Sequence, residues 1–287
     1  MFRGKIHFAS PMLWFLGFVG LFTVGGVAGV LMAVPPADFQ FHNSLFLVAH
    51  FHTMIVGGVL FGYLAGLVYW FPKFFGFKLN EFLAKSSFWF WFFGFILAFV
   101  PLYILGLMGA TRRINHYSAS MGWQGLFIVA AVGAAIIAMG IGLIVLMMIV
   151  SVFQRKKNLD TTGDPWNGRT LEWSIPSPAP YYNFAVTPVV SERDQFWVDK
   201  QNGEKKHKPI YQDIVMPKNT SISIFIGAFS FMFGFAMIWH IIWMGIVGIL
   251  GVVIFVILRV SNDKTEYVIK ADEVARLDAA YTKVELV

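Results

Sequence analysis

The sequence predicts an all-α protein that crosses a membrane six times, with a proline-rich segment between the fourth and fifth crossings. Three observations lead to this fold class. Of the 287 residues, 57% are hydrophobic and only 13% are charged, which is more apolar than a soluble domain requires. The chain contains long uninterrupted apolar stretches. Its basic residues gather in connections that alternate onto one side of a bilayer. A polytopic membrane protein is therefore expected.

The predicted crossings follow from the apolar stretches, which cover residues 8–34, 44–72, 86–108, 121–153 and 221–258. A helix needs about 20 apolar residues to cross a hydrocarbon core about 30 Å thick, so the first four cross once each. The fifth would extend about 57 Å as a single helix and must fold back on itself. Trp239, His240 and Trp243 suit a membrane interface, so the turn is predicted there. Lipid offers the backbone no other hydrogen-bond partners, so every crossing is expected to be α-helical.

The orientation is predicted from the basic residues, because cytoplasmic loops carry an excess of Lys and Arg. The N-terminus, the connection around 73–85, the segment 154–218 and the tail from 259 onward hold 20 of the 22 basic residues. With six crossings, these four segments share one side, and both termini are expected in the cytoplasm. Only Arg112 and Arg113 lie on the opposite side.

Four regions are predicted: four helices in 1–153, a connecting segment in 154–218, a transmembrane hairpin in 219–259 and a charged cytoplasmic tail in 260–287. The connecting segment holds seven of the twelve prolines, which favour extended backbone. It lacks the periodic apolar pattern of an independent domain and is expected to cap the helix ends. Residues 270–281 of the tail suit one short surface helix.

Composition also excludes several classes of function. The chain has no cysteine, so it has neither a disulfide framework nor a thiolate metal site. The net charge of +6 comes from loops beside the membrane rather than from a nucleic-acid-binding surface. Sequence motifs for phosphate binding, nucleophile–base catalysis and zinc hydrolysis are missing.

The chemically informative stretch is Ala49-His50-Phe51-His52-Thr53, inside the second apolar run. A titratable side chain at membrane depth is costly and marks a candidate functional site. On an α-helix, positions i and i+2 point about 200° apart, so the two histidines cannot share one metal ion. Each can ligate a separate prosthetic group, and two haem irons held in this way would lie about 12–17 Å apart. The alternative is two histidines that hydrogen-bond to neighbouring helices.

Polar residues near one end of this helix form a second candidate group. The short loop 35–43 carries Asp38 and His42, and Arg112 and Arg113 lie on the same predicted side. An arginine pair matches carboxylates such as haem propionates in a bidentate geometry. The alternative is an ordinary solvated loop with arginines that extend to the membrane interface.

Three motifs resemble those of haem-copper oxidase subunit I. The run 45–52, with the sequence LFLVAHFH, resembles the family's tenth-helix motif. Thr111-Arg112-Arg113 resembles its propionate-binding arginines. The stretches GDPWNGRTLEW (163–173) and PAPYYNF (178–184) resemble its cytoplasmic loop. The resemblance is strongest to the C-terminal part of the ubiquinol-oxidising branch, and it implies a partial subunit I helix bundle with a proline-rich cytoplasmic loop.

The resemblance implies a role for each candidate residue. His50 would be the proximal ligand of the high-spin haem (o- or a-type), and His52 an axial ligand of the low-spin b-type haem. Arg112 and Arg113 would hold propionates, and Asp38 would hydrogen-bond a propionate of the high-spin haem. His42 would lie near the magnesium position of related oxidases. The next residue there is usually aspartate and here is Asn43, which puts bound magnesium in doubt.

The resemblance also implies what other parts of the enzyme supply. The second low-spin haem ligand, the copper ligands, the proton channels and the quinol site would come from an N-terminal part. The implied function is a proton-pumping ubiquinol oxidase of the bacterial inner membrane that works with other oxidase subunits, and this chain is not expected to be active alone. The alternatives are an oxidase fragment without function and a haem-free membrane scaffold or transporter.

Overall fold

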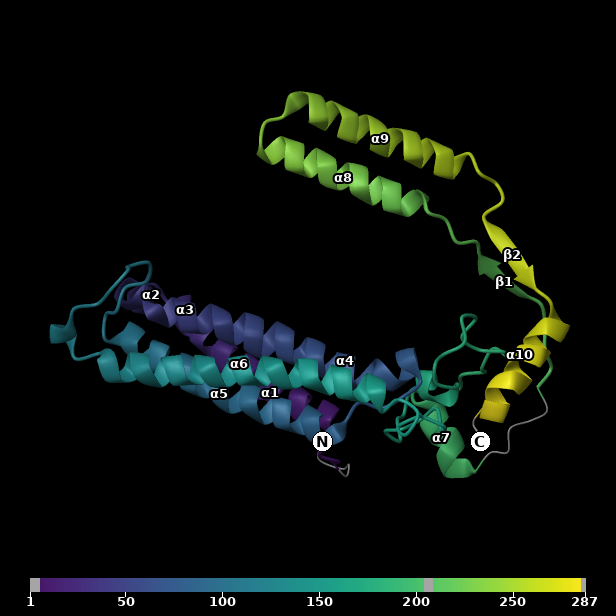
Figure 1. Ribbon diagram of the computed structural model, residues 1–287, viewed down its shortest axis with the longest axis horizontal. Helices are drawn as coiled ribbons and strands as arrows, with labels where there is room; N and C mark the ends of the chain where they lie inside the picture. The colour runs from purple at the N-terminus through teal and green to yellow at the C-terminus, as the bar shows by residue number, and fades with distance from the viewer. Residues whose placement is uncertain (1–5, 204–208, 285–287) are drawn as a thin grey trace. The chain divides into compact units, whose positions relative to one another are not determined.

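The computed structural model describes residues 6–203 and 209–284, most of which are helical (Figure 1). The chain divides into two compact units, which are considered separately. Unit 1 comprises Met1–Ala179 and Asp194–Val198, and unit 2 comprises Pro180–Arg193 and Asp199–Val287.

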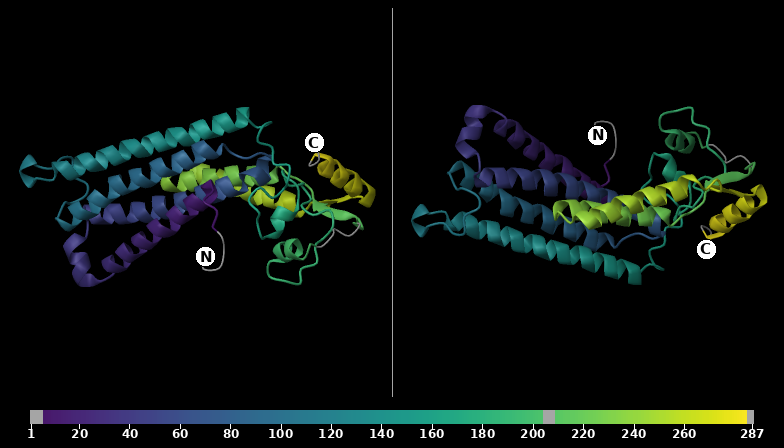
Figure 2. Two further views of the ribbon diagram at one scale, coloured as in Figure 1. Left: turned by 90° about the horizontal axis from the view of Figure 1, so that it is seen from below. Right: turned by 90° about the horizontal axis from the view of Figure 1, so that it is seen from above.

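Unit 1 is built from long helices that run alongside one another (Figure 2). The elements are α1 (Ser10–Met32), α2 (Pro35–Phe41), α3 (Leu45–His52), the π-helix η1 (Thr53–Leu60), α4 (Phe61–Phe75), α5 (Glu81–Leu107), the 3-10 turn η2 (Ala119–Met121), α6 (Gln124–Phe153) and the 3-10 turn η3 (Leu171–Ser174). The short helix α7 (Gln195–Asn202) runs across the boundary of the two units.

Five helices in the described part of the chain are long and apolar enough to cross a membrane. They are Ser10–Met32, Leu45–Phe75, Glu81–Leu107, Gln124–Phe153 and Ile242–Val260, where Leu45–Phe75 joins α3, η1 and α4. A further apolar helix, α8 (Ile222–Ile238), has 17 residues and is about 25 Å long, slightly less than the hydrocarbon thickness. The predicted class of all-α membrane protein is confirmed, and the number of six crossings stays a prediction.

The core of unit 1 is aromatic. Trp14 of α1 meets Phe61 of α4 and Phe88 of α5 edge to face, with ring centroids 4.9 and 5.3 Å apart. This is the geometry that the ring quadrupoles favour. Between α5 and α6 the backbones approach closely, because Gly94 lies against the backbone of Ile137 and Gly133 against that of Ala98. Small residues permit such close helix packing where lipid supplies no hydrophobic driving force.

The first part of the proline-rich segment covers the end of α4. Lys73 is only 5% exposed. Its Nζ donates to the carbonyl oxygens of Gly163 and Ile175 at 2.8 and 2.6 Å. The same ammonium lies 5.2 Å from the ring centroid of Trp173. A buried ammonium needs such partners, so Lys73 fastens this segment to the helix.

Unit 2 contains a helical hairpin, a short β-ribbon and a terminal helix. Helices α8 and α9 (Ile242–Val260) are joined at residues 239–241, within the stretch expected to turn, and His240 there has a φ of 56°. Strands β1 (Ile214–Pro217) and β2 (Glu266–Ile269) pair antiparallel, from Ile214↔Ile269 to Pro217↔Glu266. This ribbon is a feature that the sequence analysis did not predict.

Helix α10 (Ala271–Val284) follows β2 and matches the short helix expected in the tail. Asp213 accepts hydrogen bonds from the Ala271 backbone N–H at 2.9 Å and from Lys270 Nζ at 2.7 Å. The hydrogen bond from Lys270 lowers the pKa of Asp213 and raises that of Lys270. Val274 of this helix forms a small buried core with Tyr182 and Ile269.

Candidate functional site

The histidine pair lies on α3, a helix whose start is fixed locally. Ser44 is the N-cap: its Oγ accepts from the Phe46 backbone N–H at 3.2 Å, as N-cap residues do. Phe46 and Ala49 are buried against the rest of unit 1, and Ala49 is 0% exposed. His50 and His52, on either side of Phe51, are half-buried. The helix therefore presents both imidazoles from a well-anchored turn.

His50 faces α1. Its Nδ1 lies 3.0 Å from the carbonyl oxygen of Gly25. A carbonyl oxygen only accepts hydrogen bonds, so Nδ1 carries the proton and Nε2 presents its lone pair. A Cβ on Gly29, one turn further along α1, would lie 2.8 Å from Cε1 of the His50 ring. The absence of a side chain at Gly29 is what leaves room for this imidazole.

His52 faces α5. Its Nδ1 lies 2.8 Å from the carbonyl oxygen of Val48, one turn earlier in the same helix. By the same reasoning Nδ1 is the donor and Nε2 is left with its lone pair. The ring stacks on Phe99 of α5, with centroids 4.7 Å apart and planes inclined by 23°. The structure therefore places the two histidines against different helices, as the helical period predicts.

The two imidazoles suit a pair of separate single-ligand sites. In each, the Nδ1 proton is held by a backbone carbonyl, an arrangement typical of metal-bound histidines, because it fixes the tautomer and the ring orientation. Over residues 6–203 and 209–284, no group of three or more His, Cys, Asp or Glu side chains is placed to hold a metal ion. This donor set fits two haem groups, each of which would take one imidazole from this chain, with the porphyrin and other parts of the enzyme supplying the remaining ligands.

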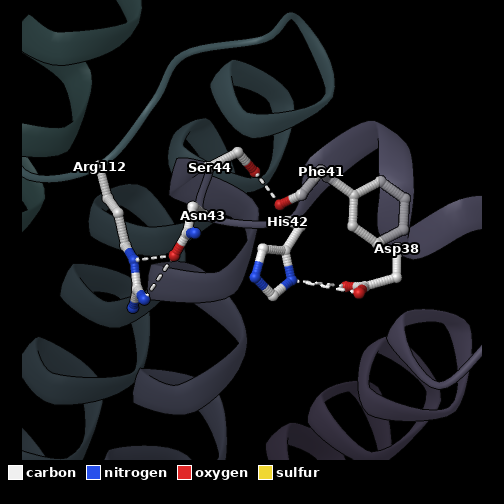
Figure 3. Close-up of polar contacts among 6 residues, drawn as sticks. All are labelled: Asp38, Phe41, His42, Asn43, Ser44 and Arg112. Carbon is white, nitrogen blue, oxygen red and sulfur yellow. Dashed lines mark hydrogen bonds and ion pairs between the residues drawn. The ribbon is translucent and has the colours of Figure 1, made fainter.

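The polar residues at the start of α3 form two neighbouring pairs (Figure 3). Asp38 and His42 are one helical turn apart on and beside α2, and His42 Nδ1 lies 3.1 Å from Asp38 Oδ2. Arg112 donates to Oδ1 of Asn43 through Nε at 3.0 Å and Nη2 at 2.6 Å. Arg113 is exposed, with a φ of 68°.

Backbone contacts bring Arg112 to this place from the far end of α5. The Arg112 N–H donates to the carbonyl oxygen of Asn43 at 2.9 Å, and the Leu45 N–H donates to that of Ala110 at 2.8 Å. The structure thus gathers Asp38, His42 and Arg112 near the start of α3. Their expected role toward haem propionates stays a prediction.

Three residues that shape the site were not identified from the sequence. Gly25 and Gly29 hold His50, and Phe99 holds His52. Each lies more than 20 positions from its histidine, and glycine and phenylalanine are abundant in this chain. The one available signal was the spacing of Gly25 and Gly29 by four residues, which puts both on one face of a helix.

Comparisons with known proteins give a consistent result. Residues 1–136 match the family described as cytochrome c and quinol oxidase polypeptide I. The chain is 51% identical to cytochrome bo(3) ubiquinol oxidase subunit 1 of Buchnera aphidicola subsp. Acyrthosiphon pisum (strain APS), over 99% of this chain and 43% of that protein. It is 49% identical to ubiquinol oxidase subunit 1 of Acetobacter aceti, with the same coverage. Identity to quinol oxidase subunit 1 of Bacillus subtilis (strain 168) is 39%, over 96% of this chain and 42% of that protein. The chain therefore spans less than half the length of these relatives.

Proposed function

Because the chain belongs to the cytochrome c and quinol oxidase polypeptide I family, we propose that it is the C-terminal part of the catalytic subunit of a ubiquinol oxidase. The complete enzyme would oxidise ubiquinol, reduce oxygen to water and pump protons. An N-terminal part of the same subunit and other oxidase subunits are the partners that this function requires. The proposed location is the bacterial inner membrane, with both chain termini in the cytoplasm.

The observation that carries the proposal is the pair of imidazoles on opposite sides of α3. His50 is proposed to ligate the high-spin haem, and His52 is proposed as one axial ligand of the low-spin haem. Both offer Nε2, because Nδ1 is bound to the carbonyl oxygens of Gly25 and Val48. When bound, the haems carry the electrons and the oxygen chemistry. The residues of this chain orient the two ligands and separate them by one helix.

The residues at the start of α3 are proposed to neutralise the haem propionates. Arg112 is already oriented by Asn43, and guanidinium groups bind carboxylates in a bidentate manner. We propose that Arg112 and Arg113 bind propionates and that Asp38 shares a proton with one of them. His42, which contacts Asp38 at 3.1 Å, would lie near the magnesium position of related oxidases. Asn43 would be a weaker magnesium ligand than a carboxylate.

The copper ion of the oxygen-reducing centre is proposed to be held by the N-terminal part. Copper favours clusters of imidazole ligands, and the described residues of this chain place no three such groups together. This chain is therefore proposed to complete two haem sites that it does not enclose alone.

Difference spectra of membranes test the proposal. The chain is produced alone and together with the N-terminal part of a relative's subunit, and reduced-minus-oxidised and carbon-monoxide spectra are recorded. Low-spin and CO-binding haem bands are expected only on co-production. If neither band appears in either case, although both polypeptides are in the membrane, the chain is a haem-free fragment or scaffold and the proposal is wrong.

A further inference from the structure

The ring of His52 has a flat aromatic neighbour on another helix. Phe99 of α5 lies 4.7 Å from it, centroid to centroid, and the two planes are inclined by 23°. The Nδ1 hydrogen bond to Val48 at 2.8 Å holds one edge of the imidazole. A hydrogen bond at one edge leaves the ring free to swing about that edge, whereas contact across the whole face does not. The His52 ring has two aromatic contacts, to Phe51 of its own helix, with centroids 4.3 Å apart and planes inclined by 31°, and to Phe99 of α5, whose plane is the more nearly parallel.

Phe99 is itself held firmly, because α5 contacts α3 and the start of η1 at three successive turns. Phe99 stacks on His52, the Tyr103 hydroxyl donates to Thr53 Oγ1 at 3.2 Å, and Gly106 lies directly against the backbone of Phe46. Positions 99, 103 and 106 share one face of a helix. At Gly106 the two backbones are in direct contact, since even a Cβ there would collide with the Phe46 backbone.

Phe99 also packs against the core of unit 1. Its ring is 4.6 Å from that of Phe95, which is only 3% exposed. Phe95 in turn lies 6.5 Å from Phe61, edge to face. Tightly packed aromatic interiors resist displacement. The core therefore holds the Phe99 ring in its orientation, and the Phe99 ring in turn contacts the face of the His52 imidazole.

We propose that Phe99 is a positioning residue that fixes the plane of the His52 imidazole and thereby tunes the low-spin haem. The inference rests on the proposed function, in which His52 is an axial ligand of that haem. Outer contacts that orient a histidine ligand tune the metal that it binds, so the plane of the His52 ring would influence the d orbitals of the ferric iron. The g values of the low-spin ferric signal in electron paramagnetic resonance would report a change in that plane.

The test uses the assembled, haem-containing oxidase, with Phe99→Leu as the main variant. Leucine keeps the site apolar but removes the flat surface. The largest g value is expected to shift and its line to broaden, while the amplitude of the low-spin optical band is retained because His52 still ligates. Phe99→Tyr keeps an aromatic face and should restore the original g values. The carbon-monoxide spectrum should not change, since His50 faces α1 instead.

Phe93→Leu is the matched control. It is the same substitution on the same helix, but Phe93 is 54% exposed and stacks on Trp89. Its g values should equal those of the parent. If Phe99→Leu does not assemble, Phe99→Met, which is also apolar and not planar, carries the same test.

The outcomes separate this inference from the proposed function. If the parent oxidase shows no low-spin signal, or if His52→Ala retains it, the assignment of His52 is wrong. If His52→Ala abolishes the signal but Phe99→Leu and Phe99→Met keep the parent's g values and line width, the positioning role of Phe99 is wrong. A shift shared equally by Phe93→Leu would also contradict it, because the effect would then be general to α5.

Discussion

Gly29 offers a direct test of how His50 is seated. A Cβ at this position would lie 2.8 Å from Cε1 and 3.4 Å from Nε2 of the imidazole. Carbon atoms in contact are separated by about 3.5–4.0 Å, so Gly29→Ala forces the ring to retreat from α1 by about 0.7 Å. The Nδ1 contact to Gly25 is already 3.0 Å long. Such a retreat takes it beyond the range of about 2.7–3.2 Å for a hydrogen bond to oxygen.

The expected loss follows from these two effects. Overpacking of a filled site costs about 1–3 kcal/mol, and the lost hydrogen bond contributes about 1 kcal/mol. Together they weaken the placement of the His50 imidazole by about 2–4 kcal/mol. If His50 ligates the CO-binding haem as proposed, this corresponds to a roughly 30- to 1,000-fold lower retention of that haem. The low-spin haem should be unaffected, because His52 contacts α5 rather than α1.

The assay is competition for haem by apomyoglobin, followed through the carbon-monoxide difference spectrum of the assembled oxidase. Gly26→Ala is the matched control, since a Cβ on Gly26 would meet no atom within 4 Å. Equal retention of CO-binding haem in the parent, Gly29→Ala and Gly26→Ala would refute the reasoning. A loss in Gly26→Ala as large as in Gly29→Ala would do the same.

Two further predictions concern residues outside the histidine pair. Lys73→Met removes an ammonium that donates to the carbonyl oxygens of three loop residues, and each charged hydrogen bond is worth about 1.5–3 kcal/mol. Backbone hydrogen exchange in residues 154–179 should therefore accelerate at least tenfold. Lys78→Met changes an exposed lysine of the same connection and should leave the exchange rate unchanged. Equal exchange rates in the two variants would contradict the role of Lys73. Burial raises the pKa of Tyr182 to about 12, so the folded protein is expected to lose stability as the pH rises from about 10 toward 12, where the unfolded chain releases this proton more readily. Tyr182→Phe should remove the last step of the tyrosinate absorbance titration, and an unchanged titration would show that Tyr182 is not the group responsible.

Tyr182→Phe also has a clear expectation at neutral pH. The Tyr182 hydroxyl is buried and has no hydrogen-bond partner among the described residues. An unsatisfied buried hydroxyl costs about 1–3 kcal/mol, so its removal should leave the thermal stability of the protein unchanged or raise it. A lower melting temperature for Tyr182→Phe would mean that the hydroxyl has a partner after all.

Much of the fold was predictable because the membrane restricts the chain to apolar helices. The first four predicted stretches are α1, α3–α4, α5 and α6, and the fifth is the pair of helices α8 and α9. The opposite orientation of His50 and His52 followed from the helical period alone. The direction in which a side chain leaves a helix depends only on its position along that helix, so it can be predicted without knowing the tertiary structure.

What the sequence did not predict depends on contacts between distant residues. The partners of the histidines, such as Gly29 and Phe99, become recognisable only when α1 and α5 are packed against α3. The π-helix η1 has no marker in residues 53–60, because its extra width is a response to packing. Lys73 was counted among the basic loop residues, whereas it is a buried residue within α4. The strands β1 and β2 have four residues each, too few for a clear alternating pattern.

Helix α3 is proposed to carry two haem ligands on opposite faces, so each haem should depend on one histidine. Reduced-minus-oxidised and carbon-monoxide difference spectra of the assembled oxidase are recorded with His50→Ala and with His52→Ala. His240→Ala serves as the control, because His240 lies in the turn between α8 and α9. The account predicts that His50→Ala loses the CO-binding haem and retains the low-spin band, and that His52→Ala does the reverse. Loss of both bands in both variants, or of neither, would contradict it.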